Sequence, residues 1–526
     1  MKKVLVFAVT LAVVLPLAQV SLAQNVQRNP IVIHELNHTT TPLPLREMTQ
    51  VAPHNQNRLM PEHKVFGHAH IGTVEPFIES LEVMPLVGTT SGLNFSGITG
   101  NQGGGYDPPD TNASVGATQV VETVNLAYSV YDKTTGALTF GPTSVQTLYT
   151  PLGGQCGTGN LSDPVVNYDK VAGRWVITLI AFNNNTFTIN DACVAVSTGS
   201  DATGTYNLYA FSYGSQLPDY PKVGVWPDAY YITTDSFKNG GSFTGADTCA
   251  LDRTNMLAGN AATAICFQRG QGDYAVLPAD ADGATAPPAG APNYQMELAT
   301  STKVNIFQFH VDFVTPSNST YTGPTQLTVT SYTDACAATG TCIVEPTPGE
   351  KLDALGDRLM FRLPYRNFGD HEALVFTHSI KASGSGKAPS AVRWYELRSP
   401  GASPTIYQSG TVGGGSSTVS KWMPSIAQDK VGNIALGYSK SNSTTKPSIE
   451  YVGRISTDTL GSMESPKLIV TGTGVQQGGG ARWGDYSSMA IDPADDCTFW
   501  YTQEYYTTNG ASWATRMASF KFTACH

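Results

Sequence analysis

Short runs of β-branched and aromatic residues fill most of the chain after about residue 105, and turns rich in Gly, Asp and Asn separate them. Runs of this length and composition are typical of β-strands. We find no stretch with the 3.6-residue period of an amphipathic helix of useful length. The pattern therefore predicts an all-β protein.

One motif recurs in this region: an aspartate, a strand, a turn that contains Asp or Gly, and a second β-rich run. In a clear copy the first strand runs from Asp219 to Trp226, the turn falls at Pro227 and Asp228, and Ala-Tyr-Tyr-Ile-Thr follows. The copies start at Asp110, Asp163, Asp219, Asp273, Asp357, Trp422 and Asp485.

The spacing of these starts indicates the architecture. Successive starts lie roughly 53 to 84 residues apart, and four short strands with their turns need roughly 40–60 residues, which is one propeller blade. We predict a β-propeller of seven blades, or of six if the copy at Asp273 is an insertion. An array of β-sandwiches is the alternative, but one recurrent start motif fits radial repetition better.

Residues 24–104 have a different character. They are rich in polar residues and proline and show no sustained strand or helix period. We predict a largely irregular N-terminal arm or pro-segment, followed by the propeller over residues 105–526. A metal-binding tail is an alternative, although the histidine spacing fits no established ligand motif. Six of the ten histidines lie here: His34, His38, His54, His63, His68 and His70.

The first 23 residues read as a signal peptide. Lys2 and Lys3 precede an apolar run over residues 4–17, and Ser-Leu-Ala at residues 21–23 forms a small-residue cleavage site. The run is short for a membrane span, and no second stretch of spanning length follows it. We therefore expect a secreted or periplasmic protein without a membrane span.

The charge balance bears on the partners. The chain has 31 Lys and Arg against 41 Asp and Glu, a net charge of −10, which becomes about −12 without the two leader lysines. Nucleic acids and anionic membranes need clustered Lys and Arg, so neither is expected as a partner. We expect a monomer that binds an extracellular glycan or other polymer.

Eight cysteines lie outside the leader, and an even number in an exported chain favours disulfides. Sequence does not fix their connectivity, but pairing between neighbours is the simplest solution. The absence of any Cys-x-x-Cys spacing argues against a zinc ribbon or a redox dithiol. Neighbour pairing would join Cys156 to Cys193, Cys249 to Cys266, Cys336 to Cys342, and Cys497 to Cys525.

The segment over residues 425–436 resembles an Asp box, with one extra residue between Asp429 and Gly432. The chain is therefore similar to sialidase-like and Asp-box β-propellers. It also resembles a group of secreted bacterial propeller proteins without an assigned activity. This second likeness spans most of residues 105–526 and implies the fold rather than the chemistry. It is carried by residues 107–111, 369–372, 393–398 and 482–487.

Phe361-Arg362-Leu363-Pro364 is similar to the Phe-Arg-Ile-Pro signature of sialidases, whose arginine binds the sialic acid carboxylate. In that family the signature lies at the start of the propeller, whereas here it falls in about the fifth repeat. We therefore favour an ordinary strand with a solvated or paired arginine.

In a propeller the first strand of each blade lines the central channel, so the aspartates at the blade starts should meet at one mouth. Converging carboxylates raise each other's pKa unless a cation offsets them. Ca²⁺, which prefers oxygen ligands, is one candidate, and Lys421, Arg358 and Arg482 are others. Alternatively, each aspartate binds backbone N–H groups and has a structural role. The predicted metal ligands are Asp110, Asp163, Asp219, Asp273, Asp357 and Asp485.

The loops after the second strands should return to the same mouth and bring further groups. A pair such as Glu504 with Asp485, or Asp235 with Asp219, could serve a glycoside hydrolase. Proton transfer by His378 or Glu504 is possible in the same location.

Aromatic and basic residues beside the starts are candidates for ligand contacts. Rings there could stack on sugars, or they could simply pack the blades. The candidates are Trp422, Trp483, Tyr486, Tyr220, Arg482 and Lys421.

Two functions follow from these features. The first is a binding module that recognises an extracellular glycan or polymer at an acidic, aromatic mouth with Ca²⁺. The second is a carbohydrate-active enzyme, namely a glycoside hydrolase, a sialidase-like enzyme or a polysaccharide lyase. The sequence carries no nucleophile elbow, His-Glu-x-x-His motif, P-loop or EF-hand loop, which favours binding without deciding whether the protein is an enzyme.

Overall fold

The structure is a computed structural model. It describes residues 29–55, 60, 63, 65, 68–72, 86–183, 186–382, 389–414 and 417–526. The predicted signal peptide lies outside these residues.

Within the described residues, the strands form seven antiparallel sets of four, in agreement with the all-β prediction. The first four are β4–β7 (Asn112–Val115, Gln119–Val124, Ala127–Asp132, Leu138–Ser144), β8–β11 (Asn160–Asp169, Arg174–Phe182, Asn190–Ser197, Tyr206–Gly214), β12–β15 (Gln216–Val225, Tyr230–Lys238, Ser242–Leu251, Thr263–Gly270) and β16–β19 (Leu277–Asp282, Asn293–Thr300, Lys303–His310, Thr320–Thr328). The others are β22–β25 (Leu363–Asn367, Glu372–Lys381, Ser390–Arg398, Thr405–Val412), β26–β29 (Ser420–Gln428, Ile434–Ser441, Ser448–Arg454, Lys467–Val470), and β30–β32 (Ser488–Ile491, Thr498–Tyr505, Ala514–Phe522) with β3 (Thr89–Thr99).

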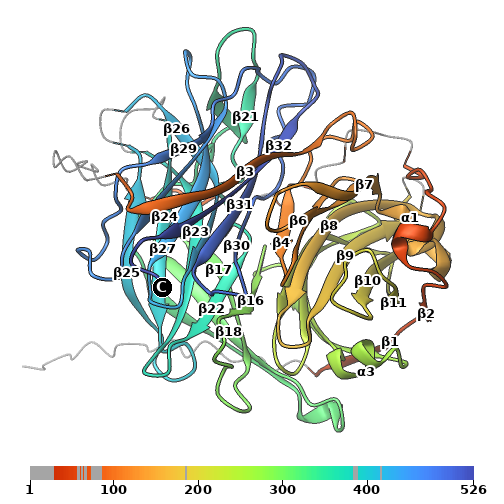
Figure 1. The fold of residues 1–526 in the computed structure, drawn as a ribbon. Helices are drawn as coiled ribbons and strands as arrows, with labels where there is room; N and C mark the ends of the chain where they lie inside the picture. The colour runs from red at the N-terminus through yellow and green to blue at the C-terminus, as the bar shows by residue number, and fades with distance from the viewer. Residues whose placement is uncertain are drawn as a thin grey trace, which may run out of the picture.

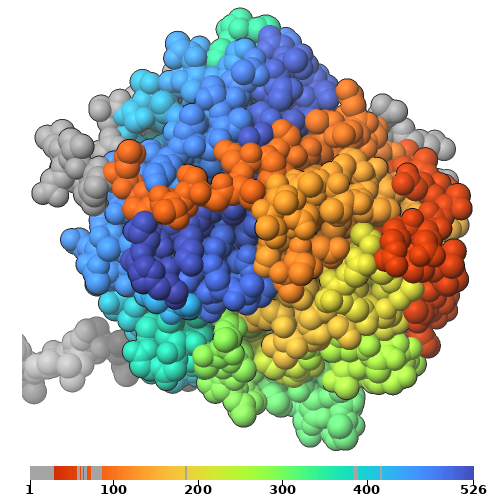
Figure 2. Space-filling model, in the orientation of Figure 1, coloured from red at the N-terminus to blue at the C-terminus, as the bar shows by residue number. Residues whose placement is uncertain are grey.

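The first strands of these sets form a closed ring. In order, β4, β8, β12, β16, β22, β26 and β30 each contact the next, and β30 returns to β4. In Figure 2 the sets occupy successive sectors of the molecular surface. This topology is a seven-bladed β-propeller, so the prediction of seven blades is confirmed and the copy at Asp273 opens a blade of its own.

The ring is closed by a strand from the N-terminal part of the chain. β3 pairs antiparallel with β32, with Thr89 opposite Phe522 and Thr99 opposite Ala514. Figure 1 shows β3 in orange beside the blue C-terminal strands. Pairing β3, which precedes the first blade, with the C-terminal strands of the last blade leaves the ring without an open junction.

The region predicted to be largely irregular contains two further strands. β1 (Ile31–His34) pairs with β15, β2 (Asn37–Thr40) pairs with β11, and the short helix η1 (Leu45–Glu47) follows them. A propeller boundary at residue 105 would separate β3 from the blade that it completes.

The remaining elements lie between or beside the blades. A hairpin of β20 and β21 lies in the long connection before β22, and β22 itself pairs parallel with β16. The bounds are β20 (Thr341–Val344), β21 (Lys351–Asp353), α1 (Gln146–Tyr149), η2 (Thr150–Leu152), α2 (Gly154–Thr158), α3 (Arg253–Ala258) and η3 (Pro316–Asn318).

All eight cysteines are paired as predicted between neighbours. The disulfides are Cys156–Cys193, Cys249–Cys266, Cys336–Cys342 and Cys497–Cys525. The hydrophobic core consists of clusters of aromatic and aliphatic side chains, many of which pack neighbouring blades together. Disulfides of this kind indicate an oxidising environment, as in the extracellular space or periplasm.

Candidate metal and ligand site at the channel mouth

The start of an inner strand is marked by a residue with left-handed backbone in several blades. The φ angles are 49° at Asp110, 53° at Asp163, 54° at Tyr220, 46° at Ala275 and 48° at Met423. Aspartate tolerates this region better than most residues, because its short polar side chain can hydrogen-bond locally. The local geometry therefore suits Asp110 and Asp163, whereas Tyr220, Ala275 and Met423 adopt the same conformation in three other blades.

Side chains from one blade fix the start of the next. Asp163 N–H donates to Asn125 Oδ1 at 3.0 Å, and Ala275 N–H donates to Asp235 Oδ1 at 3.0 Å. Each acceptor lies at or near the end of a second strand, and each donor belongs to the following blade. Asn125 and Asp235 therefore have a structural role at the mouth, because each binds a backbone N–H group of the following blade.

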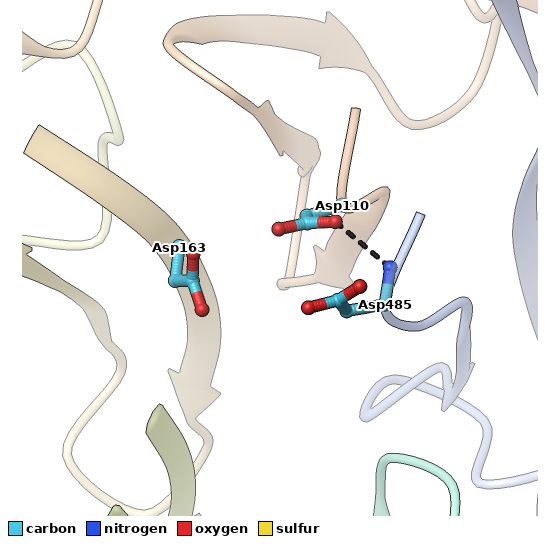
Figure 3. Close-up of side chains that lie close together, drawn as sticks. All are labelled: Asp110, Asp163 and Asp485. Atoms are coloured by element: carbon cyan, nitrogen blue, oxygen red, sulfur yellow. Dashed lines mark hydrogen bonds between the residues drawn. The ribbon is translucent and has the colours of Figure 1, made fainter. Parts of the chain in front are cut away.

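Three of the six predicted metal ligands come together. One carboxylate oxygen from each of Asp110, Asp163 and Asp485 lies within 4.8 Å of the other two. Figure 3 shows the three side chains gathered from three separate segments, with Asp485 N–H donating to Asp110 Oδ1 at 2.8 Å. We call these residues the aspartate triad.

The other three predicted ligands have partners of their own. Asp219 lies 3.0 Å from His63 Nδ1, while Asp273 pairs with Arg269 at 2.7 Å. Asp357 pairs with Arg358 at 2.9 Å. A ring of six equivalent carboxylates therefore does not form.

Two members of the triad, Asp110 and Asp163, are strongly desolvated. Burial, followed by the charges of Asp485 and Asp163, raises the pKa of Asp110 well above its usual value. Burial, followed by the charges of Asp219 and Asp485, raises the pKa of Asp163 to about 7. These directions are those expected for carboxyls that share a low-dielectric site.

The cavity at this mouth contains more acids than bases. Five carboxyl groups line it, together with two arginines and His63. Each arginine also forms an ion pair with an acid outside this lining. Arg358 pairs with Asp357. Arg482 pairs with Asp485 and also lies 3.4 Å from Asp353. The five acids are Asp110, Asp163, Asp219, Asp235 and Asp485.

The triad has donor atoms suited to a hard cation. Asp163 Oδ2 and the Tyr486 hydroxyl are buried and lack a hydrogen-bond partner among the described residues. Burial, followed by the charges of Asp163, Asp110 and Asp485, raises the pKa of Tyr486 well above its usual value. Carboxylate oxygens are ligands that Ca²⁺ prefers, so the three aspartates fit that ion.

The cavity leaves a volume of about 20 Å³ in which the centre of a water molecule can lie. That volume holds a water molecule or an ion, because one water needs roughly 10–15 Å³ on this measure. Met60 and His63 of the N-terminal segment are part of its lining. With this segment in place, the mouth offers no room for a sugar ring.

The predicted catalytic residues are dispersed. Asp485 and Asp235 line the cavity, whereas Glu504 is buried outside its lining. Burial and the charges of Asp107, Asp353 and Asp110 raise the pKa of Glu504 well above its usual value. His378 is fully buried in β23, with Nε2 3.1 Å from the Tyr395 hydroxyl.

Most of the predicted ligand-binding aromatics are core residues. Trp422, Trp483 and Tyr486 are at most 1% exposed, and the two indole rings pack 5.5 Å apart. They offer no open face to a sugar, which corrects the expectation of stacking at an aromatic mouth. Tyr220 lines the cavity, and Lys421 lies over the Tyr438 ring.

Arg482 both lines the cavity and binds the triad. It pairs with Asp485, and its loop is held by Glu350, which accepts from Ala481 N–H at 2.9 Å. The connection that contains β20 and β21 thus positions a residue of the mouth.

Two sequence signatures have structural roles. Arg362 pairs with Asp280 at 2.9 Å and with Asp282, beside a second cavity of about 30 Å³ farther along the inner strands. It is therefore the paired arginine that we favoured. Asp429 accepts from Val431 N–H and Asn433 N–H and thus stabilises a β-turn.

Two mouth residues were not predicted to act at the site. Lys222 is fully buried, and its ammonium lies 3.3 Å from the Tyr220 ring centroid and 4.1 Å from that of Tyr486. His63 contacts Asp219 from a segment predicted to be irregular. Lys222 follows the blade-start Asp219 by three residues, but the other blade-start aspartates have no lysine at that spacing.

No helix in the described part of the chain is long and apolar enough to cross a membrane.

Sequence comparison finds no matching family model and no matching curated protein. Distantly similar solved structures include the GH43 endo-arabinanase from Bacillus licheniformis, at TM-score 0.28 and 10% identity over 68% of this chain and 97% of that one. The WD40 domain of SCAP from fission yeast matches at TM-score 0.30 and 8% identity, over 77% and 82%. The exo-β-1,3-galactanase 1,3Gal43A from Clostridium thermocellum matches at 0.29 and 13%, over 76% and 88%. Such low scores carry no argument about the site, so the fold assignment rests on the ring of blades.

Proposed function

We propose that this protein is an exported propeller that binds a divalent cation, most favourably Ca²⁺, at the aspartate triad. The observation that carries the proposal is the meeting of three carboxylates, two buried and one half-buried, whose oxygens lie within 4.8 Å of one another. The unpartnered Asp163 Oδ2 supports it. A bound cation would offset the excess of acids and contribute positive charge for recognition of a ligand.

The ligand that we propose is an extracellular glycan or another polymer with hydroxyl or carboxylate groups. Recognition at the mouth requires that the described residues Met60 and His63 move aside, because they line the small cavity. Asp219, Asp235 and Arg358 would then become available as hydrogen-bonding groups around the cation.

Calcium titration of the mature protein tests the cation site. At a calcium concentration ten times Kd, the bound ion should stabilise the folded state by about 1.4 kcal/mol. Asp163→Asn should abolish both the binding heat and the thermal shift. Asp273→Asn is the matched control, since Asp273 pairs with Arg269 outside the triad. A wild-type protein without calcium-dependent heat or stabilisation would refute the proposal.

Glycan binding is tested separately, on a polysaccharide array with the mature protein in calcium and in EDTA. We expect retention that requires calcium and is lost in Asp163→Asn. Retention that is equal in both buffers would remove the cation from ligand recognition.

A carbohydrate-active enzyme is the second candidate, and two carboxyls with opposite pKa shifts favour it. Burial, against the hydrogen bond from Ala275, raises the pKa of Asp235 to about 7. Burial acts in the same sense on Asp219, but His63 outweighs it and lowers the pKa of Asp219. Such a pair could supply a general acid and a general base.

The enzyme candidate predicts that Asp235→Asn abolishes hydrolysis of a polysaccharide while the protein remains folded. Glu504→Gln is the comparison, because Glu504 lies outside the cavity lining. Absence of turnover in wild type across a polysaccharide panel would reject this candidate.

A further inference from the structure

A buried lysine contacts the lining of the mouth, because its ammonium faces the ring of Tyr220, a residue that lines the cavity with the triad. Lys222 belongs to β12, is 0% exposed, and donates to the Pro221 carbonyl at 3.0 Å. The rings of Tyr220 and Tyr486 face its ammonium at 3.3 and 4.1 Å. Contacts of this kind stabilise a desolvated cation, so the ammonium is held in place by three neighbours.

The same three carboxylates that make up the triad also attract this ammonium. Burial lowers the pKa of Lys222 to about 8, and the charges that act against this effect belong first to Asp163, Asp485 and Asp110. Tyr220 connects the two features, because its ring faces the ammonium while its hydroxyl donates to the Asp485 carbonyl at 3.5 Å. Lys222 is thus a tethered monovalent cation at a site suited to a divalent one.

We propose that Lys222 competes with a divalent cation for the aspartate triad and so sets the calcium affinity of the mouth. This inference rests on the cation site in the proposed function and adds its regulation. A fixed positive charge repels a second cation and weakens its binding.

The test is calorimetric titration of the mature protein with CaCl₂, with MgCl₂ as a second ion. Lys222→Gln removes the charge but retains a donor for the Pro221 carbonyl. It should bind calcium at least about tenfold more tightly than wild type. Lys222→Met, which keeps an apolar stem between the two rings, should give the same result if the glutamine variant fails to fold.

Lys170→Met is the matched control. Lys170 is a second lysine with a pKa lowered by burial to about 8, but it donates to the Ala281 carbonyl beside the other cavity. Its removal should leave calcium affinity unchanged. A general effect of removing a buried lysine would instead appear in both variants.

The outcomes separate the two proposals. Tight binding in Lys222→Gln with none in wild type supports the competition and refutes calcium binding by the native site. Equal affinities in both proteins refute the competition and leave the cation site standing. If neither the wild type nor the folded Lys222 variants bind calcium, both proposals are refuted.

Discussion

Two acids at the mouth have pKa values that are shifted in opposite directions, because their hydrogen-bond partners differ. Asp219 has His63 within 3.0 Å, and this partner lowers its pKa in spite of burial. Asp235 accepts from the Ala275 N–H, and burial raises its pKa to about 7. Both acids line one small cavity, so a neighbouring base, rather than depth in the protein, determines which acid is charged.

The His63–Asp219 contact should make stability depend on pH. The pKa of His63 is raised above 6.5 in the folded state, because Asp219 outweighs burial. Its contribution is therefore complete below pH 6.5 and is lost as the pH rises through the folded value. The pKa of Asp219 is lowered in the folded state, so the stability that its charge contributes is lost only when the pH falls through that folded pKa, below 3.8.

We predict that His63→Ala lowers the free energy of unfolding by about 1–2 kcal/mol at pH 5 and by less at pH 8. Chemical denaturation at the two pH values measures the difference. His371→Ala is the control, since the Asp370 partner of His371 is 83% exposed. An equal loss at pH 5 and pH 8 would contradict the assignment of a charged pair.

The residues of the site were only partly predictable, for a physical reason. Asp110, Asp163 and Asp485 could be found because an aspartate stands at most of the blade starts and so leaves a repeated mark in the sequence. The importance of Lys222 depends on contacts with residues far away in the sequence, such as Tyr486. A single occurrence of this kind leaves no periodic signal.

Among the elements, β3 has the largest effect on how the ring closes. It pairs along β32, and Glu122 of the first blade accepts from Ile98 N–H at 3.0 Å across this junction. Its sequence, Thr-Thr-Ser-Gly-Leu-Asn-Phe-Ser-Gly-Ile-Thr, is largely polar and partly exposed. For this reason the strand escaped prediction, whereas the buried inner strands were identified correctly.

A chain that begins at residue 105 lacks β3 and should therefore fold less stably than a chain that begins at residue 86, which contains this strand. Loss of β3 exposes the edge of β32, and exposed edges recruit other chains. We expect the shorter chain to aggregate or to unfold at a clearly lower temperature. Size-exclusion chromatography and circular dichroism of both chains provide the measurement, and a monomeric, equally stable shorter chain would contradict the role of β3.

At the scale of the whole molecule, the ring and its N-terminal segment form one unit. β1 and β2 extend two blades at their outer edges, and Met60 and His63 reach the central mouth. Asn55 links this segment to β8 through both backbone groups of Leu161, at 2.8 and 2.9 Å. The segment predicted to be an arm thus lies against the face at which the triad opens.

The whole-molecule arrangement predicts that this segment controls access to the mouth. The double variant Met60→Gly/His63→Ala removes two side chains from the cavity lining but leaves the triad and Lys222 in place. Because the cavity holds about 20 Å³, an entering ion must pass these side chains or wait for them to move. We expect calcium to associate about tenfold faster in the variant, with a smaller change in Kd, since association rates respond to opening steps before binding.

Stopped-flow tryptophan fluorescence can follow this step, because Trp483 lies two residues from Asp485 in the chain. Leu36→Ala is the matched control: Leu36 belongs to the same N-terminal segment but is 60% exposed and does not line the cavity. Equal association rates in the wild type and in the double variant would mean that ions reach the triad by another route. The N-terminal segment would then be a structural part of the propeller and not a barrier to its mouth.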